Sequence, residues 1–323
     1  MRKLEAITTV YSYRFPEVRE LITELTNPFP HEVFLRSVEP GLDDFHEPII
    51  DKVVKFNSKS VPHLKNFKYR YPTAGSEEGI REYLTLLQLK GVRQIYAFKG
   101  EYEGFREVGK TRSIEAIEVD PNTKPDKLKP GYWFLSNSSA RDGNIISDEV
   151  IHEICDAGHK VFYDLAYLNS TRPHEFDLGH KNIVAAVVSF SKPYGLFYDR
   201  IGFTFSKLEI PSLYANKWFK SILGLMIAEK IVTELTPTEI YDKYRPVQEE
   251  IIKTVNEVHG LNIKPSDAIL LGYLTKDDAK KLSKEKFEMI ERFLRGDSYR
   301  FCLTPYYLNR ERYGTVLRND NKN

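Results

Sequence analysis

The chain has 323 residues, of which 41% are apolar and 13% aromatic, so it can bury a large core in one or two domains. Its 47 Lys and Arg residues against 46 Asp and Glu residues give a formal net charge of +1, which argues against a nucleic-acid partner. No apolar stretch is long enough to span a bilayer, and no signal-peptide core is visible. Cys155 and Cys302 are too widely separated for a disulfide or metal-ligand pattern. These features predict a soluble, cytoplasmic protein without a membrane partner.

The first 45 residues contain four prolines and little periodicity, and we expect them to wrap around the rest of the protein. A helix is predicted next, with Ser76 as its cap, an apolar stripe from Ile80 to Leu87, and Gly91 beyond its end. Four short runs rich in aromatic and β-branched residues predict strands, at 94–98, 114–119, 132–135 and 160–163.

A second helix is predicted after Ser147, and the run from Ile183 to Val188 is apolar without alternation. Such a run is typical of a strand buried on both faces of a largely parallel sheet. A long helix from about Pro237 to His259 then leads into a second lobe. Short strands that alternate with helices indicate an α/β fold.

The buried strand ends at Ser189-Phe190-Ser191-Lys192, and Gly195 and Arg200-Ile201-Gly202 follow. Alone, this stretch could be a turn with a solvent-exposed lysine. A lysine amine can instead form a Schiff base when burial and nearby positive charge destabilise its ammonium form. Arg200 would supply that charge and could bind phosphate oxygens through two N–H groups.

The stretch from Ser189 to Gly202 resembles the lysine motif of the class I and II aminotransferase family, the pyridoxal phosphate enzymes of fold type I. The resemblance extends over residues 73–307 and implies a three-layer α/β/α large domain with a mostly parallel sheet, at 46–236. Residues 1–45 and 237–323 would form a small α+β domain. It also implies that Lys192 holds pyridoxal 5'-phosphate as a Schiff base, while Ser189, Ser191 and Arg200 contact the phosphate.

Two further segments fit this resemblance. Asp164 ends a predicted strand, where open α/β sheets bind ligands, and would pair with the pyridine nitrogen; Tyr167 would donate to the phenolic oxygen of the cofactor. Gly75 and Ser76 stand at a predicted helix start, whose free N–H groups favour an anion, and would complete the phosphate site. Without the resemblance, Asp164 could simply cap a turn, and Gly75 could belong to an ordinary capped turn.

Two residues would complete the site. Tyr102, in Glu101-Tyr102-Glu103-Gly104-Phe105, resembles the tyrosine that stacks on the pyridine ring, although an aromatic residue after a strand is often part of the core. Arg300 lies in an apolar and aromatic run and resembles the arginine that binds the substrate α-carboxylate. Its alternative is an edge-strand arginine that reaches solvent.

The chain departs from the family in a loop where an Asn-Pro-x-Asn-Pro-Thr-Gly stretch is usual. Here the residues from Asn137 to Gly143 read NSSARDG, so Ala140 aligns with the working asparagine. Asn137, or less readily Ser139, could take its place at the cofactor. The segment before Thr73 is also short, and Tyr69 or Tyr71 could replace the tyrosine that reaches the neighbouring subunit.

The resemblance favours an aminotransferase that acts on an amino acid and a keto acid, with Lys192 moving the Cα proton and with two subunits in a homodimer. A decarboxylase, lyase or oxidase with the same cofactor is the alternative within enzymes, motivated by the altered loop. A non-catalytic protein of this fold is the alternative outside enzymes. Lys192, Asp164 and Tyr167 argue against it, because a binding module would not need them together.

Overall fold

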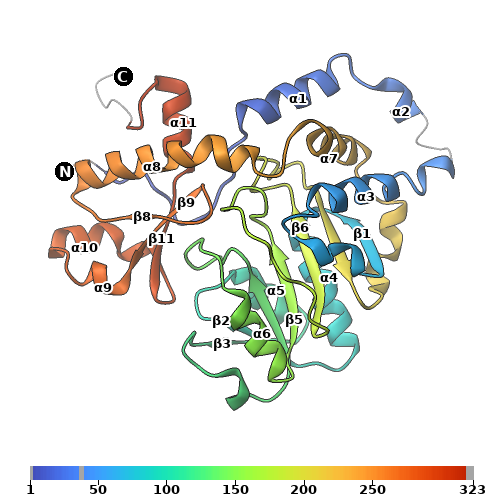
Figure 1. The fold of residues 1–323 in the computed structure, drawn as a ribbon, viewed down its shortest axis with the longest axis horizontal. Helices are drawn as coiled ribbons and strands as arrows, with labels where there is room; N and C mark the ends of the chain where they lie inside the picture. The colour runs from blue at the N-terminus through green and yellow to red at the C-terminus, as the bar shows by residue number, and fades with distance from the viewer. Residues whose placement is uncertain (1–2, 36–39, 318–323) are drawn as a thin grey trace.

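The computed structural model describes residues 3–35 and 40–317. Its larger part contains a seven-stranded sheet with the strand order β1-β7-β6-β5-β4-β2-β3, and its C-terminal third forms a four-stranded sheet with the order β10-β11-β9-β8 (Figure 1). The predicted α/β fold is therefore confirmed. In the described part of the chain, no helix has the length and apolar character needed to cross a bilayer.

All five predicted strands are found in the large sheet: those at 94–98, 114–119, 132–135, 160–163 and 183–188. The five strands β3, β2, β4, β5 and β6 are parallel to one another, whereas β7 runs antiparallel to both of its neighbours, β6 and β1. The strands are β1 (Tyr69–Thr73), β2 (Gln94–Phe98), β3 (Glu115–Val119), β4 (Tyr132–Ser136), β5 (Lys160–Leu165), β6 (Ile183–Ser189) and β7 (Gly202–Ser206). The sheet is mostly parallel, as expected.

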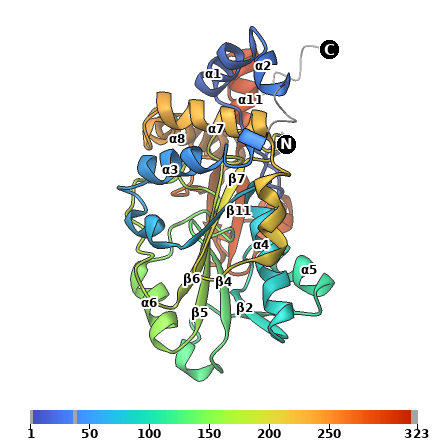
Figure 2. The ribbon, with the colours of Figure 1, turned by 90° about the vertical axis from the view of Figure 1, so that its right-hand side faces the viewer.

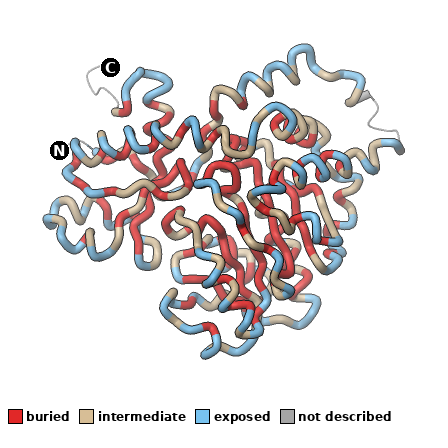
Figure 3. Tube along the Cα trace, in the orientation of Figure 1, coloured by how far each residue is buried: buried red, intermediate tan, exposed pale blue. Residues whose placement is uncertain are grey.

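Helices cover both faces of this sheet, and successive side chains along each strand point to opposite faces. Phe134 and Phe162 pack in one apolar cluster with α4 (Gly75–Leu89), while Trp133 and Tyr163 pack in the other with α6 (Asp148–Asp156). Figure 2 shows α4 and α5 (Glu103–Thr111) on one side of the strands and α6 on the other. The inner strands of the sheet are buried along most of their length, whereas the edge strands β1 and β3 are partly exposed (Figure 3).

Helix α4 lies unusually close to the sheet, and a glycine makes this possible. A Cβ atom added to Gly79 would lie 2.2 Å from the Thr204 hydroxyl and 2.6 Å from a Val187 methyl group. The prediction that Ser76 caps this helix is wrong, because the cap is Ala74 and Ser76 lies in the first turn.

The C-terminal third begins with α8 (Glu239–His259), which starts two residues later than predicted and ends at Gly260 with φ 59°. Its sheet contains β8 (Lys264–Pro265), β9 (Leu271–Thr275), β10 (Leu294–Arg295) and β11 (Ser298–Cys302). The N-terminal segment joins this sheet through a bridge between Ile7 and Cys302. The domain boundaries at residues 46 and 237 stay a prediction.

The remaining helices surround these two sheets. They are α1 (Pro16–Thr26), α2 (His31–Leu35), α3 (Glu47–Phe56), α7 (Ile222–Glu234), α9 (Lys276–Ala279), α10 (Lys284–Ile290) and α11 (Thr304–Tyr313), with short 3-10 turns at Pro40–Leu42, Pro62–Asn66, Pro125–Lys127, Pro211–Lys217 and Glu291–Phe293. The first 45 residues thus contain regular helices that their sequence pattern did not predict.

Candidate active site

A cavity of about 640 Å³ lies at the carboxyl ends of the parallel strands. Nine of the eleven residues expected in the site line it: Ser76, Tyr102, Asp164, Tyr167, Ser189, Ser191, Lys192, Arg200 and Arg300. Gly75 lies directly behind this lining, and Asn137 does not reach the cavity. Segments from all parts of the chain therefore converge at the place where an open α/β sheet binds its ligand.

Lys192 follows the end of β6, and its side chain enters the cavity. Its ammonium group donates a hydrogen bond of 2.6 Å to the carbonyl oxygen of Val10. The pKa of Lys192 is lowered to about 8, mainly by burial and additionally by the nearby Arg300 and Arg200, against the opposing effect of Cys302 and Asp164. A substantial fraction of the amine is therefore neutral near physiological pH, as a nucleophile or base requires.

Asp164 lies at the end of β5 and is 4% exposed. Its Oδ2 atom accepts a hydrogen bond of 3.3 Å from the Ser136 hydroxyl, whereas Oδ1 is buried without a partner. The pKa of Asp164 is raised to about 7, mainly by burial and additionally by the carboxylate of Glu101. A buried carboxylate oxygen without a donor is costly, so this atom is suited to a ligand that brings an N–H group.

The other end of the cavity is built for an anion. Gly75 begins α4, and a Cβ atom at this residue would lie 2.7 Å from Nη2 of Arg200. Arg200 donates through Nη2 to the Ala74 carbonyl at 2.7 Å and through Nη1 to the Phe197 carbonyl at 3.2 Å. The Ser191 hydroxyl is buried without a partner. Helix N–H groups, a guanidinium and a free hydroxyl together match a phosphate group.

Arg300 enters the cavity from β11 and is 4% exposed. Its Nη1 donates to the carbonyl of Ala140, its Nη2 donates to the carbonyl of Thr8 at 2.8 Å, and its Nε has no partner. Burial lowers the pKa of Arg300. Among residues 3–35 and 40–317, no carboxylate forms an ion pair with this guanidinium, so it is suited to an anionic ligand.

Two tyrosines form further parts of the wall. The Tyr102 hydroxyl donates a hydrogen bond of 2.7 Å to Glu77, whose carboxylate also lines the cavity. Tyr167 is 4% exposed, and burial raises the pKa of its hydroxyl well above the usual value. Both phenols are therefore neutral and able to donate hydrogen bonds. Glu77 was not predicted, because a glutamate in a first helical turn is common without any functional role.

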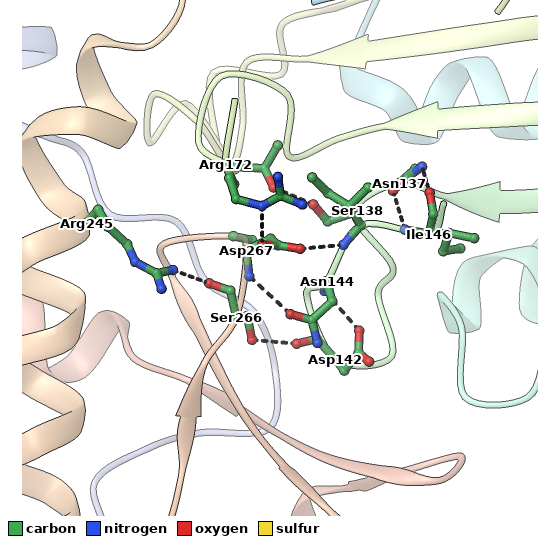
Figure 4. Close-up of polar contacts among 12 residues, drawn as sticks. Asn137, Ser138, Asp142, Asn144, Ile146, Arg172, Arg245, Ser266 and Asp267 are labelled. Carbon is green, nitrogen blue, oxygen red and sulfur yellow. Dashed lines mark hydrogen bonds and ion pairs between the residues drawn. The ribbon is translucent and has the colours of Figure 1, made fainter. Parts of the chain in front are cut away.

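The structure places Asn137 outside the cavity, in contrast to the prediction that its side chain reaches the cofactor. Its amide nitrogen donates to the Ile146 carbonyl at 2.9 Å, and its Oδ1 accepts from the Ile146 N–H at 2.9 Å (Figure 4). The amide nitrogen also donates to the Tyr163 hydroxyl at 2.7 Å. These bonds use the amide to fix the loop. Ala140 lines the cavity in its place.

Other residues at or near the cavity were missed because nothing in their local sequence marks them. Thr9 and Val10 of the N-terminal segment line the wall, although they are far from Lys192 in sequence. Glu101 is buried directly behind Ala140. Of the two tyrosines considered for a contact with a second subunit, Tyr71 accepts a hydrogen bond of 3.0 Å from the Ile210 N–H within its own chain.

Among known proteins, no family model matches the chain. Part of the chain is similar to histidinol-phosphate aminotransferase 2 of Archaeoglobus fulgidus, with 24% identity over 161 residues. The match covers 48% of this chain and 46% of that protein, so it spans about half of each.

Solved structures resemble the chain over most of its length. L-threonine-O-3-phosphate decarboxylase from Porphyromonas gingivalis has a TM-score of 0.63 at 17% identity, covering 92% of this chain and 93% of that one. Histidinol-phosphate aminotransferase from Sinorhizobium meliloti, solved with pyridoxal-5'-phosphate, has a TM-score of 0.64 at 16% identity, covering 85% and 76%. The chain therefore has the fold of the type I pyridoxal phosphate enzymes, which confirms the resemblance to the class I and II aminotransferases.

Proposed function

We propose that the chain is a pyridoxal phosphate-dependent aminotransferase that acts on an α-amino acid and a keto acid. The observation that carries this proposal is one cavity that holds a buried lysine, a buried carboxylate oxygen without a donor, and a buried arginine without a counter-ion: Lys192, Asp164 and Arg300. These three groups meet the needs of an amino acid on this cofactor, namely a covalent anchor, a ring partner and a carboxylate partner.

Pyridoxal phosphate fits the arrangement of polar groups. Ser76, Ser191 and Arg200, with the N-terminus of α4, would hold the phosphate group. The Oδ1 atom of Asp164 would accept the ring N–H, which gives this buried oxygen the hydrogen bond that it lacks. The Sinorhizobium meliloti aminotransferase, which is similar in fold, was solved with pyridoxal-5'-phosphate, and this supports the assignment.

The residues of the chain have separate roles in the proposed reaction. When bound, the cofactor supplies an electron-withdrawing ring that stabilises negative charge at the substrate Cα. Arg300 orients the substrate by binding its carboxylate, and Asp164 keeps the ring nitrogen protonated. The Nζ atom of Lys192 would accept the proton from Cα, since its lowered pKa of about 8 places it close to the working pH. The amino group would stay on the bound cofactor when water releases the first keto acid, and would then pass to a second keto acid.

Absorbance spectroscopy of the purified protein tests this proposal. We expect a visible band from cofactor bound to Lys192, and its loss when a productive amino acid is added without a keto acid. Lys192→Ala should remove the band, whereas Lys207→Ala should retain it, because Lys207 lies outside the cavity and donates to the carbonyls of His180 and Lys181. A band that persists unchanged in Lys192→Ala, or the absence of an amino-group half-reaction with every amino acid tried, would refute the proposal.

A second candidate is decarboxylation with the same cofactor. Two observations favour it: the similarity in fold to the Porphyromonas gingivalis decarboxylase, and the position of Asn137 outside the cavity. An elimination or an oxidative reaction is open to the same site. Mass spectrometry of the products separates these reactions, because decarboxylation loses carbon dioxide and retains the amino group, whereas transamination yields a keto acid.

We also propose that the enzyme is a homodimer. Four large aromatic residues between positions 198 and 219 are exposed: Tyr198 is 81% exposed, Tyr214 58%, Trp218 45% and Phe219 80%. Tyr198 also lines the cavity, so a partner that covers this segment would help to close the site. Sedimentation should show a dimer in the wild-type protein and a weakened one in Phe219→Glu. A monomeric wild-type protein with full activity would contradict this assignment.

A further inference from the structure

Glu101 is a buried acid whose two carboxylate oxygens both bind the altered loop. The Ser139 hydroxyl donates to Oε1, and the Ala140 N–H donates to Oε2 at 3.2 Å. Glu101 is 5% exposed. Hydrogen bonds to a buried charged acceptor are stronger than neutral ones, and a lost partner is not replaced by water there. The carboxylate therefore fixes the main chain at Ala140.

Ala140 is held from its other side by Arg300. The Ala140 carbonyl accepts from Nη1 of this guanidinium, while its N–H is bound by Glu101. One residue thus joins the buried carboxylate to the buried arginine. Because Nη1 is bound to Ala140, the rotation of the guanidinium plane depends on where Ala140 lies, and so does the direction of the free Nε–H.

The later part of the same loop is fixed separately, to the C-terminal sheet. The Ser266 hydroxyl donates to the Asp142 carbonyl at 2.5 Å, and the Ile145 N–H donates to the Asp267 carboxylate at 2.9 Å (Figure 4). Arg172 donates to the other oxygen of Asp267 at 2.8 Å. The loop is therefore anchored downstream without Glu101, and the Ser139 main chain is bonded to Gly143 and Asn144. Loss of Glu101 would leave these bonds in place and remove the acceptors of the Ser139 hydroxyl and the Ala140 N–H.

We propose that Glu101 is a positioning residue for the substrate carboxylate: it holds Ala140, and through Ala140 it sets the orientation of Arg300. This inference rests on the proposed function, because it assumes that Arg300 binds a carboxylate. It also explains how the unusual loop is held in position: Glu101, which lies outside the loop, binds its main chain at Ala140. Glu101 need not touch the substrate to have this effect.

Two variants and one matched control test the proposal. Glu101→Gln removes the charge and leaves an NH₂ group where an acceptor is needed; Ser139→Ala removes one donor and keeps the charge of Glu101. Glu118→Gln is the control, because Glu118 is exposed and its carboxylate accepts a long hydrogen bond of 3.4 Å from the Gly100 N–H, outside the loop. Thermal unfolding of each variant checks that the protein still folds.

We expect Glu101→Gln to raise the KM for the amino acid roughly tenfold with kcat changed by less than about threefold, the pattern of lost uniform binding. Ser139→Ala should change KM in the same direction by a smaller factor. Hydrogen–deuterium exchange of the cofactor-free proteins provides a second readout: amides in the peptide spanning residues 137–146 should exchange faster in both variants, and at the wild-type rate in Glu118→Gln.

Two outcomes would overturn the proposal. One is unchanged exchange of the loop in both variants. The other is a fall in kcat at constant KM in Glu101→Gln together with no effect of Ser139→Ala, because this result would assign Glu101 to an electrostatic effect on Asp164. A wild-type protein without any half-reaction would refute the proposed function instead, and the exchange measurement would still decide whether Glu101 fixes the loop.

Discussion

The buried carboxyl group of Asp164 predicts a distinctive pH dependence of stability. Its pKa is raised from 3.8 to about 7 in the folded chain, mainly by burial and additionally by Glu101. Between these two values the folded protein keeps the proton that the unfolded chain has released. The stabilising contribution of this group is thus complete below pH 4 and is lost as the pH rises through 7.

The magnitude follows from the difference between the two pKa values. One pKa unit corresponds to about 1.4 kcal/mol, so a shift of about three units gives an upper value of about 4 kcal/mol. Relaxation and water penetration reduce such values, and we expect about 2–4 kcal/mol lost from the wild type between pH 4 and pH 7. Asp164→Asn has no proton to release and should lack this loss.

Thermal unfolding of the cofactor-free proteins measures this difference. At about 2 °C per kcal/mol, the melting temperature of Asp164→Asn relative to wild type should rise by about 4–8 °C between pH 4.5 and pH 7.5. Saturating pyridoxal phosphate should abolish the wild-type trend, since a ring N–H would stabilise the ionised carboxylate. Parallel pH profiles for the two cofactor-free proteins would refute the assigned pKa and its cause.

Three further substitutions test other parts of the site. Arg300→Lys should raise the KM for the amino acid by about 10- to 100-fold, because an ammonium cannot bind a carboxylate through two parallel bonds; steady-state kinetics that match wild type would exclude this role. Asn137→Ala should lower the free energy of unfolding by about 1–3 kcal/mol, since it leaves the buried Tyr163 hydroxyl without its partner; urea denaturation measures this loss. Gly75→Ala should weaken cofactor binding, because its φ of 76° is strained for alanine and its Cβ would meet Arg200; equal dissociation constants by fluorescence titration would contradict this expectation.

The strands that were predicted correctly are those whose own apolar, aromatic and β-branched residues indicate a strand. The run from Ile183 to Val188 is apolar throughout, and it is β6, at the centre of the sheet. β1 was missed because Tyr69–Thr73 contains Pro72 and is a strand only through its pairing with β7, far along the chain. Helix α7 was missed because Ile222–Glu234 lies among other helices and lacks a clear polar face.

The same distinction applies to the site. Lys192, Asp164 and Arg300 could be predicted because each lies in a stretch whose local residues resemble those of a known family. The direction of the Asn137 side chain could not be predicted, because it depends on the path of the loop. Glu101 gave no signal either, since its role arises from a contact with Ser139, 38 residues away.

The hydrogen bonds from Lys192 and Arg300 to the N-terminal segment have a consequence for cofactor loading. The Val10 carbonyl accepts from Nζ of Lys192, and the Thr8 carbonyl accepts from Nη2 of Arg300. The N-terminal segment thus competes for Lys192 and Arg300, the two residues that would bind the cofactor and the substrate carboxylate. By linkage, any change that strengthens its docking lowers the apparent affinity for the incoming ligands by the same free energy. The occupancy of the enzyme would then depend on how firmly its own first residues are held.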